Sequence, residues 1–176
     1  MFIDGAYLDF LLRDEFKLAK IRYDALAAMM AQGSEILRTY YYNCPPYQSS
    51  APTADERDRF ARAQRFYTYL ERLPRYEVRL GRLALRGCNQ AGEPIFEQKR
   101  VDLMLGVDLA LLSGKGQITD AALLAGDSDL IPAVVAAKSQ GVVVHLFHGP
   151  TYHKDLWDHA DERTLIAPAF VNAIKA

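Results

Sequence analysis

The sequence lacks a long apolar run, and it has little cysteine. None of its apolar stretches approaches the roughly 18 residues of a membrane helix, and no charged segment followed by an apolar one marks a secretory signal. The 176 residues include two cysteines, Cys44 and Cys88, which have no metal-binding spacing. Such isolated cysteines favour free thiols in a reducing compartment. We therefore expect a cytoplasmic protein with no membrane partner.

The net charge is close to zero, and the common cofactor-binding motifs are absent. The formal net charge is −1, so any binding of nucleic acid must rest on local basic patches and not on an overall positive field. The chain contains no GxGxxG, P-loop or GxSxG motif, which argues against a dinucleotide enzyme, a P-loop NTPase and an α/β-hydrolase. Its four histidines are not accompanied by other metal-ligating residues at the spacing of a zinc site.

The patterning that is present predicts a single α/β domain over residues 1–176. Half the residues are hydrophobic and about a quarter are charged, as in soluble globular proteins. Because strands alternate with helices, we expect βαβ units and a parallel sheet. The expected strands are 1–4, 36–42, 76–85, 122–125, 142–147 and 164–166. The expected helices are 5–12, 23–32, 55–73, 101–112, 130–140 and 152–160, and residues 87–94 are expected to form a turn.

Acidic residues follow two of the apolar strands directly. The run Ala121-Ala-Leu-Leu-Ala-Gly-Asp-Ser-Asp-Leu130 ends in Asp127 and Asp129, and Met1-Phe-Ile-Asp-Gly5 repeats the arrangement with Asp4. Asp102 opens a helix shortly after Lys99. Ligands of open α/β sheets bind beyond the carboxyl ends of the strands. If the first and fourth strands are neighbours, all four aspartates can converge on one crevice.

Such a cluster predicts a divalent cation. Clustered carboxylates repel one another, and Mg²⁺ or Mn²⁺ removes that repulsion because hard cations prefer carboxylate oxygen. Each acid taken alone also fits a helix cap or a turn, and Asp129 is expected at or near the N-cap of the helix that follows it. Asp108 is either a supporting acid behind the metal ligands or a surface charge, and Ser128 is a second supporting candidate.

Basic and aromatic residues near the acids are candidates for substrate binding. Lys99 is the one most readily placed beside a scissile phosphate, because it lies so close to Asp102 in the sequence. Tyr47 lies in a turn-rich loop and is free either to stack on a base or to pack. The arginines of helix 55–73 form either a solvated face or a track for a phosphate backbone. The remaining candidates for substrate contact are Arg82, Arg100 and Tyr7.

Three segments resemble the NYN domain family, closest to its LabA-like branch, whose members are relatives of PIN-domain nucleases. They are Phe2-Ile-Asp-Gly-Ala-Tyr-Leu8, Gln98-Lys-Arg-Val-Asp-Leu103 and Leu124-Ala-Gly-Asp-Ser-Asp-Leu-Ile-Pro132, and the similarity extends to Arg79-Leu-Gly-Arg82 and to residues 156–161. The resemblance implies a PIN-like (Rossmann-like) three-layer α/β/α fold with a central parallel sheet in the order 3-2-1-4-5. It also implies a metal-dependent endoribonuclease whose acids fall on Asp4, Asp102, Asp127 and Asp129.

Three function classes follow. The first is a Mg²⁺- or Mn²⁺-dependent endoribonuclease that acts on single-stranded or structured RNA, with the homodimer as one assembly open to it. The second is a catalytically weak or inactive module for RNA binding or regulation. It is motivated by Tyr7, which stands where the family often has asparagine, and by a first strand so short that the native chain could begin upstream of Met1. The third is a phosphotransfer enzyme, disfavoured because Gly5 and Ala6 follow Asp4 in place of an Asp-x-Asp motif.

Overall fold

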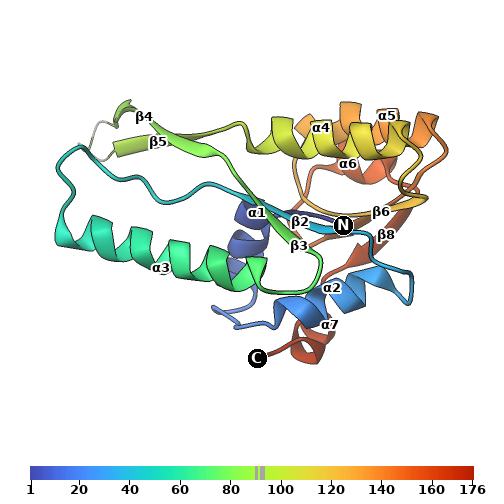
Figure 1. Cartoon of the computed structure of the whole chain (residues 1–176), viewed down its shortest axis with the longest axis horizontal. Helices are drawn as coiled ribbons and strands as arrows, with labels where there is room; N and C mark the ends of the chain where they lie inside the picture. The colour runs from blue at the N-terminus through green and yellow to red at the C-terminus, as the bar shows by residue number, and fades with distance from the viewer. Residues whose placement is uncertain (90, 92–93) are drawn as a thin grey trace.

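The computed structural model describes residues 1–89, 91 and 94–176 and is built on a six-stranded sheet (Figure 1). The sheet order is β3-β2-β1-β6-β7-β8, and every neighbouring pair is parallel. The strands are β1 (Phe2–Asp4), β2 (Thr39–Asn43), β3 (Tyr76–Leu80), β6 (Asp120–Leu124), β7 (Val143–His148) and β8 (Glu162–Leu165). The expected order 3-2-1-4-5 is confirmed as β3-β2-β1-β6-β7, and β8 adds a sixth strand at one edge.

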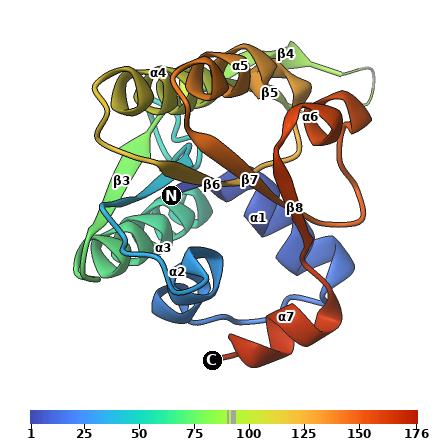
Figure 2. The same ribbon diagram turned by 90° about the vertical axis from the view of Figure 1, so that its right-hand side faces the viewer.

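Helices cover both faces of the sheet and complete three layers (Figure 2). One face carries α4 (Val101–Gly114), α5 (Ile131–Ser139) and α6 (Lys154–His159). The other carries α1 (Gly5–Phe10), α2 (Tyr23–Ala31), α3 (Ala54–Glu71) and α7 (Pro168–Ala173), with a π-helical turn, η1 (Leu11–Glu15), continuing α1. Across the described parts of the chain, no helix has both the length and the apolar character needed to cross a membrane.

The central strands are apolar without interruption because both of their faces are buried. Phe2 and Leu123 pack into the core beneath α4 and α5, whereas their neighbours Ile3 and Leu124 pack into the core on the opposite face. Successive side chains of a strand point to opposite sides, so a strand between two helical layers needs apolar residues at every position. This burial explains why continuous apolar runs in the sequence located β1, β6 and β7.

The strand expected over 76–85 is wrong in extent, because it breaks at Gly81. β3 ends at Leu80, and β4 (Arg82–Cys88) leaves the sheet to pair antiparallel with β5 (Pro94–Lys99). A methyl group at Gly81 would lie 2.5 Å from the carbonyl oxygen of Lys99, so only glycine fits this close approach. The turn expected over 87–94 is also shorter than predicted: both of its end residues belong to these strands, and residues 90, 92 and 93 lie outside the described part of the chain.

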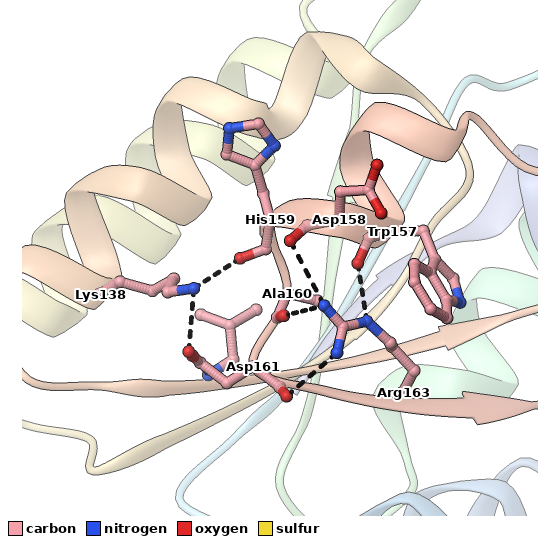
Figure 3. Close-up of polar contacts among 8 residues, drawn as sticks. Lys138, Trp157, Asp158, His159, Ala160, Asp161 and Arg163 are labelled. Carbon is pink, nitrogen blue, oxygen red and sulfur yellow. Dashed lines mark hydrogen bonds and ion pairs between the residues drawn. The ribbon is translucent and has the colours of Figure 1, made fainter.

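A polar network fastens the corner where α5, α6 and β8 meet (Figure 3). The guanidinium of Arg163 donates to the carbonyl oxygens of Trp157 at 2.8 Å and Ala160 at 2.6 Å, and it stacks 4.3 Å from the Trp157 ring. Lys138 forms an ion pair with Asp161 at 2.9 Å, and the Asp161 carboxylate accepts a hydrogen bond from a backbone amide of β7. Arg163 therefore satisfies carbonyls that the end of α6 would leave without a partner.

Candidate functional site

The four aspartates predicted to act together all lie at the carboxyl edge of the sheet. Asp4 is the last residue of β1, and Asp127 and Asp129 follow β6 directly. Asp102 lies in the first turn of α4. β1 and β6 are neighbours, with Ile3 paired to Leu124, so the adjacency that the site requires is confirmed.

Asp4 is buried and held in place by the backbone. Only 9% of its surface is exposed, and its Oδ1 accepts hydrogen bonds from the amides of Ala6 at 3.0 Å and Tyr7 at 3.1 Å, which caps α1. Burial, assisted by the charges of Asp102 and Asp127, raises the pKa of Asp4 to about 6, although the hydrogen bonds from the two amides act in the opposite direction. Asp4 thus lies within electrostatic reach of acids from two other elements.

The remaining acids influence one another in the same way. Burial raises the pKa of Asp102, and the negative charges of Asp127 and Asp129 add to that rise. Together with the effects on Asp4, these interactions make the four aspartates one coupled group of negative charge. We call this group the acid cluster.

Asp127, and not Asp129, caps the turn after β6. Its Oδ1 accepts a hydrogen bond from the amide of Asp129 at 3.1 Å, at the start of the short 3-10 turn η2 (Ser128–Leu130). The predicted position of Asp129 near the N-cap of the next helix is confirmed, because Leu130 is the N-cap of α5, but its side chain does not cap that helix. Asp129 lies exposed in that turn, and Ser128 lies partly buried between the two acids.

The oxygen donors of the acid cluster suit a hard cation, although they do not form a ready-made cage. Among the residues described by the structure, no three His, Cys, Asp or Glu side chains are gathered closely enough to hold a metal ion. Mg²⁺ is commonly held by one or two carboxylates and keeps several waters, so it does not require three direct protein ligands. The mutual repulsion within the cluster is the condition that a divalent cation relieves.

Asp108 is bound to partners on two strands. Its Oδ2 accepts a hydrogen bond from the hydroxyl of Tyr42 at 2.9 Å and lies 3.5 Å from Nε of Arg79. Arg79 in turn stacks over the Tyr40 ring at 5.6 Å. These contacts tie the middle of α4 to β2 and β3, so Asp108 positions the helix that begins with Asp102.

The residues predicted to contact substrate differ in how free they are. The Tyr7 hydroxyl donates to the carbonyl oxygen of Thr151 at 2.6 Å and accepts from the amide of Gly149 at 2.9 Å, so it is engaged within the protein. Lys99 forms an ion pair with Glu97, as does Arg86. Arg82 and Arg100 are exposed, and neither forms an ion pair with any residue in the described ranges.

Two residues at the end of β2 were not singled out from the sequence. Asn43 is 8% exposed, and its amide nitrogen donates to Asp9 and to the Tyr41 hydroxyl, each at 3.2 Å. Burial raises the pKa of the Cys44 thiol, and the charges of Asp102 and Asp4 raise it further, so Cys44 borders the acid cluster. The available signal was position, because Asn43 follows an apolar strand just as Asp127 does.

Two of the surface cavities lie at different ends of the sheet. One of about 530 Å³ lies at the amino ends of the strands, where Met1, Asp120 and Val143 contribute to its lining, and none of the four aspartates lines it. The other, of about 450 Å³, lies between the loop after β2, α3 and β4. The larger cavity is thus separate from the acid cluster.

A comparison with protein families supplies a match to most of the chain. The family model of the NYN domain matches residues 1–167, a range that includes all four aspartates of the acid cluster. Neither the curated proteins nor the solved structures gave a match.

Proposed function

The chain belongs to the NYN domain family, and on that premise we propose that it is a metal-dependent endoribonuclease that hydrolyses RNA phosphodiesters in the cytoplasm. The observation on which this depends is the acid cluster at the carboxyl edge of the sheet, where burial and mutual charge raise the pKa of both Asp4 and Asp102. Residues with perturbed pKa values in the crevice of an α/β sheet are typical of functional sites.

In this proposal Asp4, Asp102 and Asp127 hold Mg²⁺ or Mn²⁺ directly or through water. Backbone amides fix Asp4 and Asp127 through one oxygen each, which leaves the other oxygen for a ligand. The exposed Asp129 orients a water, and Lys99 and the nearby arginines bind the RNA backbone. A bound divalent cation would supply polarisation of the phosphoryl oxygen and a lower pKa for an attacking water.

A second candidate function is a non-catalytic RNA-binding or regulatory module with the same fold. It is favoured by the lack of any ready-made three-ligand group in the described part of the chain. It is also favoured by Tyr7, whose hydroxyl is engaged with the backbone of Gly149 and Thr151 where the family often has asparagine.

Cleavage of end-labelled RNA separates the two functions. We expect single-stranded and hairpin RNA to be cut in Mg²⁺ or Mn²⁺ and not in EDTA, with a 5′-phosphate on the product. Asp127→Asn should lower the rate by about 100-fold or more. Asp120→Asn is the matched control, because Asp120 lies at the amino end of β6, whereas Asp127 follows its carboxyl end.

Equal cleavage by Asp127→Asn, or cleavage in EDTA, would contradict the ribonuclease proposal. RNA binding that survives substitution of all four aspartates, without turnover at high protein concentration, would favour the non-catalytic module.

A further inference from the structure

The second cavity forms a groove along the loop that follows β2, the strand in which Tyr42 pairs in register with Asp4, and we call it the side groove. Figure 1 shows the β4–β5 ribbon and α3 extending from the same side of the sheet, with the loop after β2 between them. The groove measures about 450 Å³. Its lining comes from this loop, α3 and β4, and consists of Pro45, Pro46, Tyr47, Gln48, Phe60, Arg82, Leu83, Ala84 and Leu85.

Aromatic rings gather at the side groove. The ring centroid of Tyr47 lies 5.0 Å from that of Phe96 on β5, and the two planes are tilted by 38°. Phe96 is 39% exposed, although a ring of this size is usually covered in a folded protein. Phe60 adds a third ring from α3. Exposed rings next to one another form a surface on which unpaired bases stack.

The side groove also presents a basic side chain, that of Arg82. Two other basic side chains of the β4–β5 ribbon, Arg86 and Lys99, both form ion pairs with Glu97. Arg82 lines the groove and makes no ion pair within the ranges that the structure describes. Its guanidinium therefore remains available for a phosphate, for which its planar donors are well suited.

Both walls of the side groove continue from segments that neighbour residues of the acid cluster. On the loop wall, Tyr42 of β2 pairs in register with Asp4, and residues 45–48 line the groove three residues further along the chain. The ribbon wall starts at Arg82, which pairs in register with Lys99, three residues before Asp102. A chain lying in the groove would therefore lead to the acids.

We propose that the side groove binds the single-stranded stretch of RNA next to the cleaved phosphodiester. Bases stack on Tyr47 and Phe96, and Arg82 binds a backbone phosphate. A duplex is a poorer ligand, because its bases are stacked inside the helix and cannot reach the rings. This inference rests on the proposed ribonuclease function, since it assigns the groove to the same substrate.

Fluorescence anisotropy with a labelled single-stranded oligoribonucleotide in EDTA tests the proposal without cleavage. Tyr47→Leu should raise the Kd by about 5-fold to about 100-fold, whereas Tyr47→Phe keeps the ring and should stay within about twofold. Phe96→Leu should weaken binding in the same direction and provides a second test on a more exposed ring. Arg82→Gln should lower the slope of log Kd against log salt by about 0.7.

The matched control is Tyr69→Leu, because Tyr69 is 44% exposed on α3 but does not line the groove. Wild-type affinity in Tyr47→Leu and Phe96→Leu, equal affinity for single strand and duplex, or no binding of single-stranded RNA would each overturn the proposal. Metal-dependent cleavage together with wild-type RNA affinity in the groove variants would contradict the groove proposal and leave the ribonuclease proposal intact. Groove-dependent binding without metal-dependent cleavage would do the reverse.

Discussion

The ring of Tyr7 packs directly on Gly126, so a methyl group at Gly126 would lie 2.4 Å from Cε2 of that ring. The hydroxyl of the same tyrosine bonds to the backbone of Gly149 and Thr151. Tyr7 thereby joins the turn that carries Asp127 to the loop after β7. At the position where the family often has asparagine, this chain has a residue that supports the acid cluster from behind.

Substituting Gly126 tests this packing. Gly126→Ala should lower the free energy of unfolding by about 1–3 kcal/mol, because the new methyl group overlaps the Tyr7 ring. Combining it with Tyr7→Ala should remove the overlap, so the two losses should fall short of additivity by about 0.5–3 kcal/mol. Chemical denaturation of the single and double variants measures the coupling, and strict additivity would contradict direct packing.

The pKa of Asp4 predicts a pH-dependent gain of stability in Asp4→Asn. Because folding raises this pKa from about 3.9 to about 6, ionised Asp4 disfavours the folded state by up to about 3 kcal/mol. The variant should match wild type near pH 4, gain stability as pH rises to about 6, and keep the gain at pH 8. Asparagine still caps α1, so the helix should persist.

Thermal denaturation across that pH range measures this difference. Each kcal/mol should shift the Tm by about 2–4 °C in a chain of this size. Asp120→Asn is the control, since Asp120 is exposed and lies at the other end of β6. A gain in Asp4→Asn that is the same at pH 4 and pH 8 would show that charge is not its cause.

Mn²⁺ or Mg²⁺ should stabilise the wild-type protein at neutral pH. A ligand that binds only the folded state adds about 2.7 kcal/mol at 100 times its Kd, and here it would also relieve the repulsion between Asp4, Asp102 and Asp127. The Tm should therefore rise with metal concentration, and Asp127→Asn should lose most of the effect. A rise of the same size in Asp127→Asn would place the metal elsewhere.

Asp108→Ala should be costly although Asp108 is not among the proposed metal ligands. Removing its carboxylate leaves the Tyr42 hydroxyl and the Arg79 guanidinium without their shared partner, at a cost of about 1–3 kcal/mol. Urea denaturation measures this loss. The affinity for Mn²⁺ should change little, and a metal affinity reduced as strongly as in Asp127→Asn would instead make Asp108 a ligand.

Residues on buried strands could be located from the sequence, whereas the ribbon could not. The expected strand over 76–85 joined two alternating patterns, Val78 and Leu80 before Gly81, then Leu83 and Leu85 after it. The apolar residues stand at even positions before Gly81 and at odd positions after it, and this change marks where the chain leaves the sheet. The pairing partner of β4 lies in another segment, so local alternation could not reveal it.

For the acid cluster, too, the sequence predicted some features and not others. Apolar runs that end in Asp4 and Asp127 predicted where the acids lie, because strand ends are local features. The hydrogen bonds of Tyr7 to Thr151 and of Tyr42 to Asp108 join positions far apart in the sequence. Contacts of this kind depend on the finished sheet, so no spacing in the sequence could indicate them.

The sheet order also has a consequence for how the chain is made. Phe2 in β1 pairs on one side with Tyr40 and on the other with Leu123, so one edge of the central strand has no partner until most of the protein has been synthesised. An open apolar edge of this kind is a template for aggregation. During synthesis on the ribosome, this edge of β1 therefore stays open until β6 has emerged, long after β2 can cover the other edge.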